Sequence, residues 1–211
     1  MNKYIKILGH IFLGLVSEKL FSQTYPDTIL MLNGNSIITS IIESNDSLTR
    51  FANPKKPNKS LVVENDRIFA IKNPSGEKLM YYYDSVKGND LTIEEMRYYI
   101  LGEQDAQKGY KPRGALIGGI LIGAASGITG SFLAPIPPFA YTALLGIPKI
   151  KIKKKTVSNP ELLKQQTYLM GYERVARKKR NIQSLIGGGA GLVVGMGTYG
   201  VFKATGNEIF K

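Results

Sequence analysis

The first half of the chain carries short apolar runs separated by turn residues. The runs are rich in β-branched side chains, and Asn33-Gly34 between the first two is a strong hairpin signal. Pro54 and Pro57 favour a polar loop in the middle of the series. Six short strands at this spacing indicate a small antiparallel β-barrel or rolled sheet. The strands are expected at residues 28–32, 36–43, 48–52, 60–63, 67–72 and 78–84.

Two long apolar segments follow, at residues 114–147 and 184–202. Each carries glycines four residues apart, a spacing that places them on one face of a helix. A glycine face lets another helix backbone approach closely, which is how helices associate in lipid. We therefore expect two transmembrane helices, the first of them broken by the prolines within 135–138. The predicted helix-packing residues are Gly119, Gly123, Gly127, Gly187, Gly191 and Gly195.

A further helix is predicted ahead of each apolar segment. Thr92 and Glu95 fit a capping box at the start of the first helix. Residues 159–161 (Asn-Pro-Glu) fit the start of the second, with an N-cap, a proline and an acid in order. The two helices share a short match between residues 99–102 (Tyr-Ile-Leu-Gly) and 168–171 (Tyr-Leu-Met-Gly). Two copies of opposite orientation would resemble an inverted repeat, and a chance match explains the same four residues equally well.

The N-terminus has the pattern of a secretory signal peptide. Lys3 and Lys6 precede a short apolar run, and residues 21–23 (Phe-Ser-Gln) offer a processing site before Thr24. A retained anchor is the alternative, but the run is shorter than the roughly 20 residues that a bilayer span needs. The predicted organisation is 1–23 signal peptide, 24–88 extracytoplasmic β module, 89–113 juxtamembrane helix, 114–147 first membrane segment with a proline break, 148–183 basic loop and helix, 184–202 second transmembrane helix, and 203–211 tail.

Positive charge is concentrated between the two apolar segments. Residues 24–113 hold 12 basic and 12 acidic residues, whereas residues 149–180 hold 11 basic and 2 acidic ones. A basic loop is typical of the cytoplasmic side, so the expected topology has the β module outside and this loop inside. Because the basic clusters adjoin apolar segments, they favour anionic lipid head groups over nucleic acid as partners. The residues expected at the head groups are Lys151, Lys153, Lys154, Lys155, Arg177, Lys178, Lys179 and Arg180.

The sequence offers few groups for catalytic or metal chemistry. It has no Cys, and its one His, His10, lies in the segment that a signal peptidase would remove. A mature chain without His or Cys excludes Ser-His-Asp and Cys-His sites, and zinc sites built on imidazole or thiolate. Glu103 and Asp105 are two residues apart, and such neighbours on a helix do not face each other. The sequence therefore predicts a protein that is not an enzyme and that binds neither cofactor nor metal.

Several short motifs resemble those of a known group of proteins. The motifs are residues 21–23 (Phe-Ser-Gln), 27–29 (Asp-Thr-Ile) with 33–34 (Asn-Gly), 102–106 (Gly-Glu-Gln-Asp-Ala), 159–163 (Asn-Pro-Glu-Leu-Leu), and 171–172 (Gly-Tyr) with 176–180 (Ala-Arg-Lys-Lys-Arg). In these the chain resembles cell-envelope membrane proteins of Bacteroidetes-type bacteria, which have a signal peptide, a small β module and two glycine-rich membrane segments. The group has no assigned activity. The resemblance implies a compartment and an architecture, and it adds no site residue.

Together these features predict an α+β membrane protein of the bacterial inner membrane. A small β interaction module would be tethered by glycine-zipper helices that associate with a second copy or with a membrane partner. One alternative is a secreted protein, periplasmic or associated with the outer membrane, whose glycine segments pack on a partner. A second alternative is an enzyme that uses carboxylate or Tyr/Lys chemistry.

Overall fold

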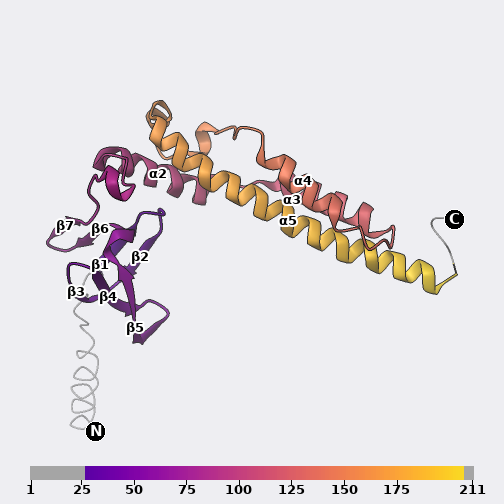
Figure 1. The fold of residues 1–211 in the computed structure, drawn as a ribbon, viewed down its shortest axis with the longest axis horizontal. Coiled ribbons are helices and arrows are strands. Elements are labelled where there is room, and N and C mark those ends of the chain that lie inside the picture. Colours follow the sequence, from indigo (N-terminus) through magenta and orange to yellow (C-terminus); the bar gives the residue numbers. More distant parts are fainter. Residues whose placement is uncertain (1–26, 207–211) are drawn as a thin grey trace, which may run out of the picture.

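The computed structural model describes residues 27–206, so the predicted signal peptide and the last residues of the tail lie outside the described part. A β module lies at one end of a long helical rod (Figure 1). The strands are β1 (Asp27–Met31), β2 (Ser36–Thr39), β3 (Ile41–Ser44), β4 (Leu48–Asn53), β5 (Lys56–Glu64), β6 (Ile68–Asn73) and β7 (Gly76–Leu79). The helices are α2 (Ile93–Gly109), α3 (Arg113–Gly127), α4 (Ile136–Gly146) and α5 (Gln166–Ala204), with short 3₁₀ turns η1 (Asn65–Arg67), η2 (Ser85–Lys87), η3 (Lys154–Thr156) and η4 (Pro160–Lys164).

The β module consists of two antiparallel sheets, in the orders β2-β1-β6-β7 and β3-β4-β5. The α+β class and the antiparallel pairing are confirmed, but a closed barrel is wrong. The expected strand at 36–43 is interrupted at Ser40, so that its halves, β2 and β3, belong to different sheets. The expected polar loop around Pro57 is instead part of β5, which pairs only with β4. Proline is tolerated there because the strand lies at a sheet edge.

The four-stranded sheet is covered on both faces. Ile29 and Ile68 pack with Phe51 of the other sheet, while Phe69 packs with Ile100 of α2 on the opposite side. This explains why β6 is apolar at four consecutive positions, all of them buried. A strand that is buried on both faces has no solvent side to fill with polar residues.

Helix α2 joins the β module to the rod. The predicted capping box is present, since the Thr92 side chain accepts from the Glu95 amide and the Glu95 carboxylate accepts from the Thr92 amide. Gly34, at the β1–β2 turn, has φ +76° and lies so close to α2 that an added Cβ would be 2.9 Å from Cβ of Glu103. The Gln104 side chain donates to the Gly34 carbonyl over 3.2 Å. A hairpin turn therefore fixes the sheet against the helix.

The apolar half of the chain forms a helical hairpin beside one continuous helix. The 15-residue α3 ends at Gly127, before the prolines, and α4 returns along α5. The predicted basic helix and the predicted second membrane helix form one element, because α5 runs unbroken for 39 residues. It is long and apolar enough to cross a membrane, whereas α3 is apolar but shorter.

Helices α3 and α5 run in the same direction. An added Cβ at Gly119, Gly123 or Gly127 would meet successive turns of α5, beginning at Ser184 and ending at Met196. The polar connection from α4 to α5 therefore returns to the end of the rod that carries the β module (Figure 1). The expected topology separated the basic loop from the β module by a membrane. In this fold α3 and α5 are parallel, and both the basic loop and the β module lie at the end of the rod where α3 begins.

Candidate functional site: an apolar helical rod with a basic cleft at its base

The six glycines predicted to pack helices lie between α3 and α5 of the same chain. An added Cβ at Gly123 would be 2.9 Å from the Leu192 amide nitrogen, and one at Gly191 would be 2.7 Å from the Ala124 amide nitrogen. Each helix thus presents its glycines to the backbone of the other, with no room for a side chain between them. In this structure these six glycines are occupied by the contact between α3 and α5 of one chain.

The outside of the rod carries the large apolar side chains. Among the most exposed are Leu121 (65%), Phe139 (63%) and Val193 (74%). Residues 114–148 and 181–202 contain no Asp, Glu, Lys or Arg. A rod with small residues inside and large apolar residues outside reverses the usual arrangement of a water-soluble core.

Two buried hydroxyl groups inside the rod are hydrogen-bonded to each other. Thr142 on α4 donates through its hydroxyl to the Pro138 carbonyl over 3.0 Å, and the Ser184 hydroxyl on α5 donates to Thr142 Oγ1 over 2.9 Å. Both side chains are buried. Small hydroxyl residues that bond across helices are common where helices pack in lipid.

The short sequence repeat lies where α2 and α5 cross. Gly102 packs against the Tyr168 carbonyl and Gly171 against the Tyr99 carbonyl, so each copy accommodates the backbone of the other. The two copies run in the same direction, and an inverted repeat is therefore wrong. A second match, Ala-Leu-Ile-Gly-Gly at 115–119 and Ser-Leu-Ile-Gly-Gly at 184–188, continues the repeat at the same spacing and was missed.

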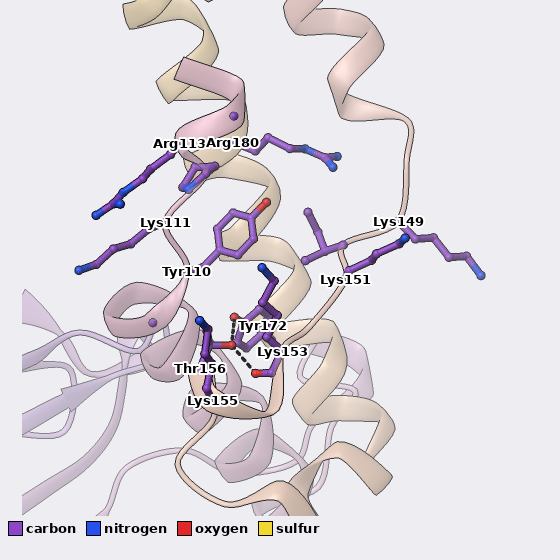
Figure 2. Close-up of a pocket in the computed structure, with 14 residues that line it drawn as sticks. Tyr110, Lys111, Arg113, Lys149, Lys151, Lys153, Lys155, Thr156, Tyr172 and Arg180 are labelled. Atoms are coloured by element: carbon purple, nitrogen blue, oxygen red, sulfur yellow. Dashed lines mark hydrogen bonds between the residues drawn. The ribbon is translucent and has the colours of Figure 1, made fainter. Parts of the chain in front are cut away.

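A basic cleft of about 750 Å³ lies at the base of the rod, beside the β module end. It is bordered by the α2–α3 junction, by the extended segment after α4 and by α5 (Figure 2). Its lining has no acidic residue. The lining cations are Lys111, Arg113, Lys149, Lys151, Lys153, Lys155 and Arg180, and hydroxyl groups come from Tyr110, Thr156 and Tyr172.

Arg180 is the buried member of this set, with only 9% of its surface exposed. Its Nη2 donates to the Pro148 carbonyl over 2.9 Å. Its Nε is shielded from solvent and has no hydrogen-bond partner among the described residues. Burial raises the pKa of the nearby Tyr110, and the Arg180 charge opposes that rise. The cleft is therefore bordered by a largely buried cation.

The other residues expected at lipid head groups have different surroundings. Arg177 donates to the Gly146 carbonyl over 2.8 Å and thus closes the C-terminal end of α4. Lys179 donates to the Gln107 carbonyl over 2.8 Å, near the end of α2. Lys154 and Lys178 are exposed and lie outside this cleft. The structure thus brings Lys151, Lys153, Lys155 and Arg180 together and gives Arg177 and Lys179 a role at helix ends.

Asp105 holds the basic segment in place. Its Oδ2 accepts from the amide and hydroxyl of Ser158, both over 2.8 Å, and from the Tyr168 hydroxyl over 2.7 Å. Burial raises the pKa of Tyr168, and the bond to Asp105 raises it further. The Thr156 hydroxyl lies 2.7 Å from that of Tyr172, which fixes the lower wall of the cleft. The sequence pattern presents Asp105 only beside Glu103, as a candidate catalytic carboxylate, and does not indicate this role.

Glu103 is a buried carboxylate at the contact between α2, α5 and the Gly34 turn. Its Oε1 accepts from Arg174 over 3.0 Å, while its Oε2 is buried without a partner among the described residues. Burial raises the pKa of Glu103 above its ordinary value of 4.5, and the charge of Arg174 opposes the rise. The group therefore contributes stability that is full below pH 4.5 and is lost as the pH rises through its raised pKa.

We expect Glu103→Gln to be at least as stable as the parent protein at about pH 7, because the amide removes a buried charge. The melting temperature of the variant should also change less between about pH 5 and about pH 7. Thermal unfolding in detergent at both pH values measures this, with Glu43→Gln, an exposed glutamate, as the matched control. A clear loss of stability at neutral pH for Glu103→Gln alone would mean that the Arg174 pair outweighs burial.

Within residues 27–206, no three His, Cys, Asp or Glu side chains lie close enough together to hold a metal ion. Comparison with protein-family models, curated proteins and solved structures finds no match for this chain. The function is therefore argued from the rod and the cleft.

Proposed function

We propose that this chain is a non-enzymatic membrane protein of the bacterial cell envelope that holds a small β interaction module at a membrane surface. Helices α3 and α4 and the apolar half of α5 would lie in the lipid. The observation that carries the proposal is the reversed packing of the rod, with glycines inside and side chains such as Leu121 and Val193 outside. In water this surface would remain hydrated at a large free-energy cost, whereas in lipid it costs nothing.

The lengths of the helices suit this arrangement. From Arg180 to Lys203, α5 rises about 35 Å at 1.5 Å per residue, enough for the roughly 30 Å hydrocarbon core. Helix α3, at about 22 Å, is too short to cross alone. Its hairpin with α4 would therefore enter the membrane and return, with its backbone satisfied by α-helical bonds and shielded by α5.

The proposal differs from the sequence-based one in two ways. Association between copies through the six predicted glycines is left out, because these glycines pack between α3 and α5 of one chain. The basic segment and the β module are placed together on the extracytoplasmic side, since the signal-peptide pattern at 1–23 precedes both. The lysines on that segment would then meet the anionic head groups of the facing leaflet.

A spin-label experiment tests whether the rod lies in lipid. The chain has no Cys, so Val193→Cys, Leu121→Cys and the β5 control Val62→Cys each provide one labelling site. All three positions are exposed, at 74%, 65% and 52% respectively. In proteoliposomes, dissolved oxygen should relax the labels on the rod more than a water-soluble nickel complex does, because oxygen concentrates in hydrocarbon.

At the Val62 position the nickel complex should relax the label more than oxygen does, since the β module lies in water. Stronger relaxation by the nickel complex at positions 193 and 121 would place the rod in water. That result would favour the alternative of a secreted protein whose apolar surface is covered by a protein partner.

A further inference from the structure

The charges around the basic cleft repel one another. Lys111 and Arg113 come from the α2–α3 junction, Lys151 and Lys153 from the segment after α4, and Arg180 from α5 (Figure 2). No carboxylate lines this cleft to balance them. Hydrogen bonds that Asp105 accepts from Ser158 fix the segment after η3 and so hold the cations in place. A fixed group of like charges in a concave site favours a bound anion.

Two features point to a specific anion site rather than a diffuse basic surface. Arg180 is nine-tenths buried and lines the cleft, and among the described residues its guanidinium makes one hydrogen bond, from Nη2 to the Pro148 carbonyl, so Nη1 is left for a ligand. Helix α3 begins at the cleft with Pro112 as a cap that makes no side-chain bond, and with no acid in its first turn. The amides of Arg113 and Ala115 donate to the Lys111 and Pro112 carbonyls, and the positive end of the helix dipole has no acidic side chain beside it.

We propose that the cleft binds a phosphate-bearing group, with the Arg180 guanidinium as its buried anchor and the lysines as the rim. Guanidinium matches the geometry of phosphate oxygens, and lysines add point charge. The hydroxyl groups of Tyr110 and Tyr172 can donate to further oxygens. The cleft volume of about 750 Å³ exceeds what a lone phosphate needs and fits a phosphorylated head group.

The same chemistry has two sources, an anionic lipid head group or a free phosphate. The lipid source rests on the proposed function, because the cleft lies where α3 enters the proposed membrane. Gly114 lines the cleft and the exposed apolar residue Ile117 follows on α3. An acyl chain that leaves the cleft can therefore continue along the rod.

The test uses the full chain purified in an uncharged detergent, with binding measured by titration calorimetry. The probes are dihexanoyl phosphatidic acid, inorganic phosphate and, as a zwitterionic control, dihexanoyl phosphatidylcholine. We expect saturable binding of phosphatidic acid and much weaker binding of phosphatidylcholine. Saturable phosphate binding that displaces phosphatidic acid would support the site with a soluble ligand. Binding of phosphatidic acid alone would support a lipid head group.

The variants locate the site. Arg180→Gln should weaken binding about tenfold, because a charge-assisted hydrogen bond is lost. The double variant Lys151→Gln/Lys153→Gln, at two exposed positions, should weaken it by a similar factor, about tenfold. The matched control Lys56→Gln/Lys59→Gln removes two exposed lysines from β5 and should change affinity by less than about twofold, because salt screens distant charges. Arg180→Lys serves as a check, because it keeps the positive charge but loses the planar set of N–H donors of the guanidinium.

The proposal is overturned if neither phosphate probe binds saturably, or if the β5 control weakens binding as much as the cleft double variant. Because the double variant alters only exposed lysines, a folding defect at Arg180 cannot obscure the outcome. The spin-label result at Val193 is measured separately. Lipid exposure of the rod without binding in the cleft would remove this proposal and leave the proposed function standing.

Discussion

Gly191→Ala should lower the free energy of unfolding by about 3 kcal/mol, the cost of forcing extra volume into a tight contact. The new Cβ would lie 2.7 Å from the Ala124 amide nitrogen and closer still to the Ile120 carbonyl oxygen, where real Cβ atoms keep at least 3.0 Å. Both neighbours are helix backbone, which cannot move aside as a side chain can. The helices must separate, and the contact along the whole α3–α5 interface weakens.

The matched control is two residues away on the same helix. An added Cβ at Gly189 meets nothing within 4 Å. Gly189→Ala should therefore leave stability unchanged or raise it by up to about 1 kcal/mol, the difference in helix propensity between alanine and glycine. Reversible denaturation in mixed micelles, followed by far-ultraviolet circular dichroism, measures both. Equal effects of the two substitutions would show that these glycines matter for flexibility rather than for close packing.

The local features of the fold could be predicted from short sequence patterns. The Asn33-Gly34 turn and the Thr92–Glu95 capping box depend on neighbouring residues, and both form as expected. The sheet arrangement depends on distant contacts. At the break at Ser40, which sends β2 and β3 to different sheets, the Ile41 amide donates to the side chain of Asp27, a residue of β1.

The glycine faces show a similar division between what local and distant contacts decide. Glycines spaced four residues apart indicate a helix face without side chains, but they do not identify the helix that packs against it. Here the partner is in the same chain and parallel, which requires the α3–α4 hairpin to return the chain to its starting end. The match of residues 115–119 with 184–188 was a usable signal, because a repeat in register along parallel helices places like faces together.

Only part of the basic cleft could be predicted from the sequence. The lysines at 149–155 and the charges at 177–180 are evident as clusters. The burial of Arg180 is not, because it depends on the segment after α4 folding back over α5, where Pro148 supplies an acceptor. Lys111 and Arg113 were not grouped with these clusters, since they are remote in sequence.

The second prediction with a large expected effect concerns the side of the membrane on which the β module and the basic segment lie. Because α3 and α5 are parallel, the β module and the basic segment must be reached from the same side of any membrane around the rod. Ser47, in the β3–β4 turn, and Lys154, in η3, are both exposed. With no native cysteine in the chain, Ser47→Cys and Lys154→Cys each give a single labelling site, whatever the compartment.

The most direct test is labelling of these two cysteines by a membrane-impermeant maleimide, in intact cells with a permeabilised outer membrane and in inverted inner-membrane vesicles. The account predicts that both sites react in one preparation and both are protected in the other. Ser47→Cys reacting in the cells while Lys154→Cys reacts only in the inverted vesicles would contradict it, because such a result requires a membrane between the β module and the basic segment.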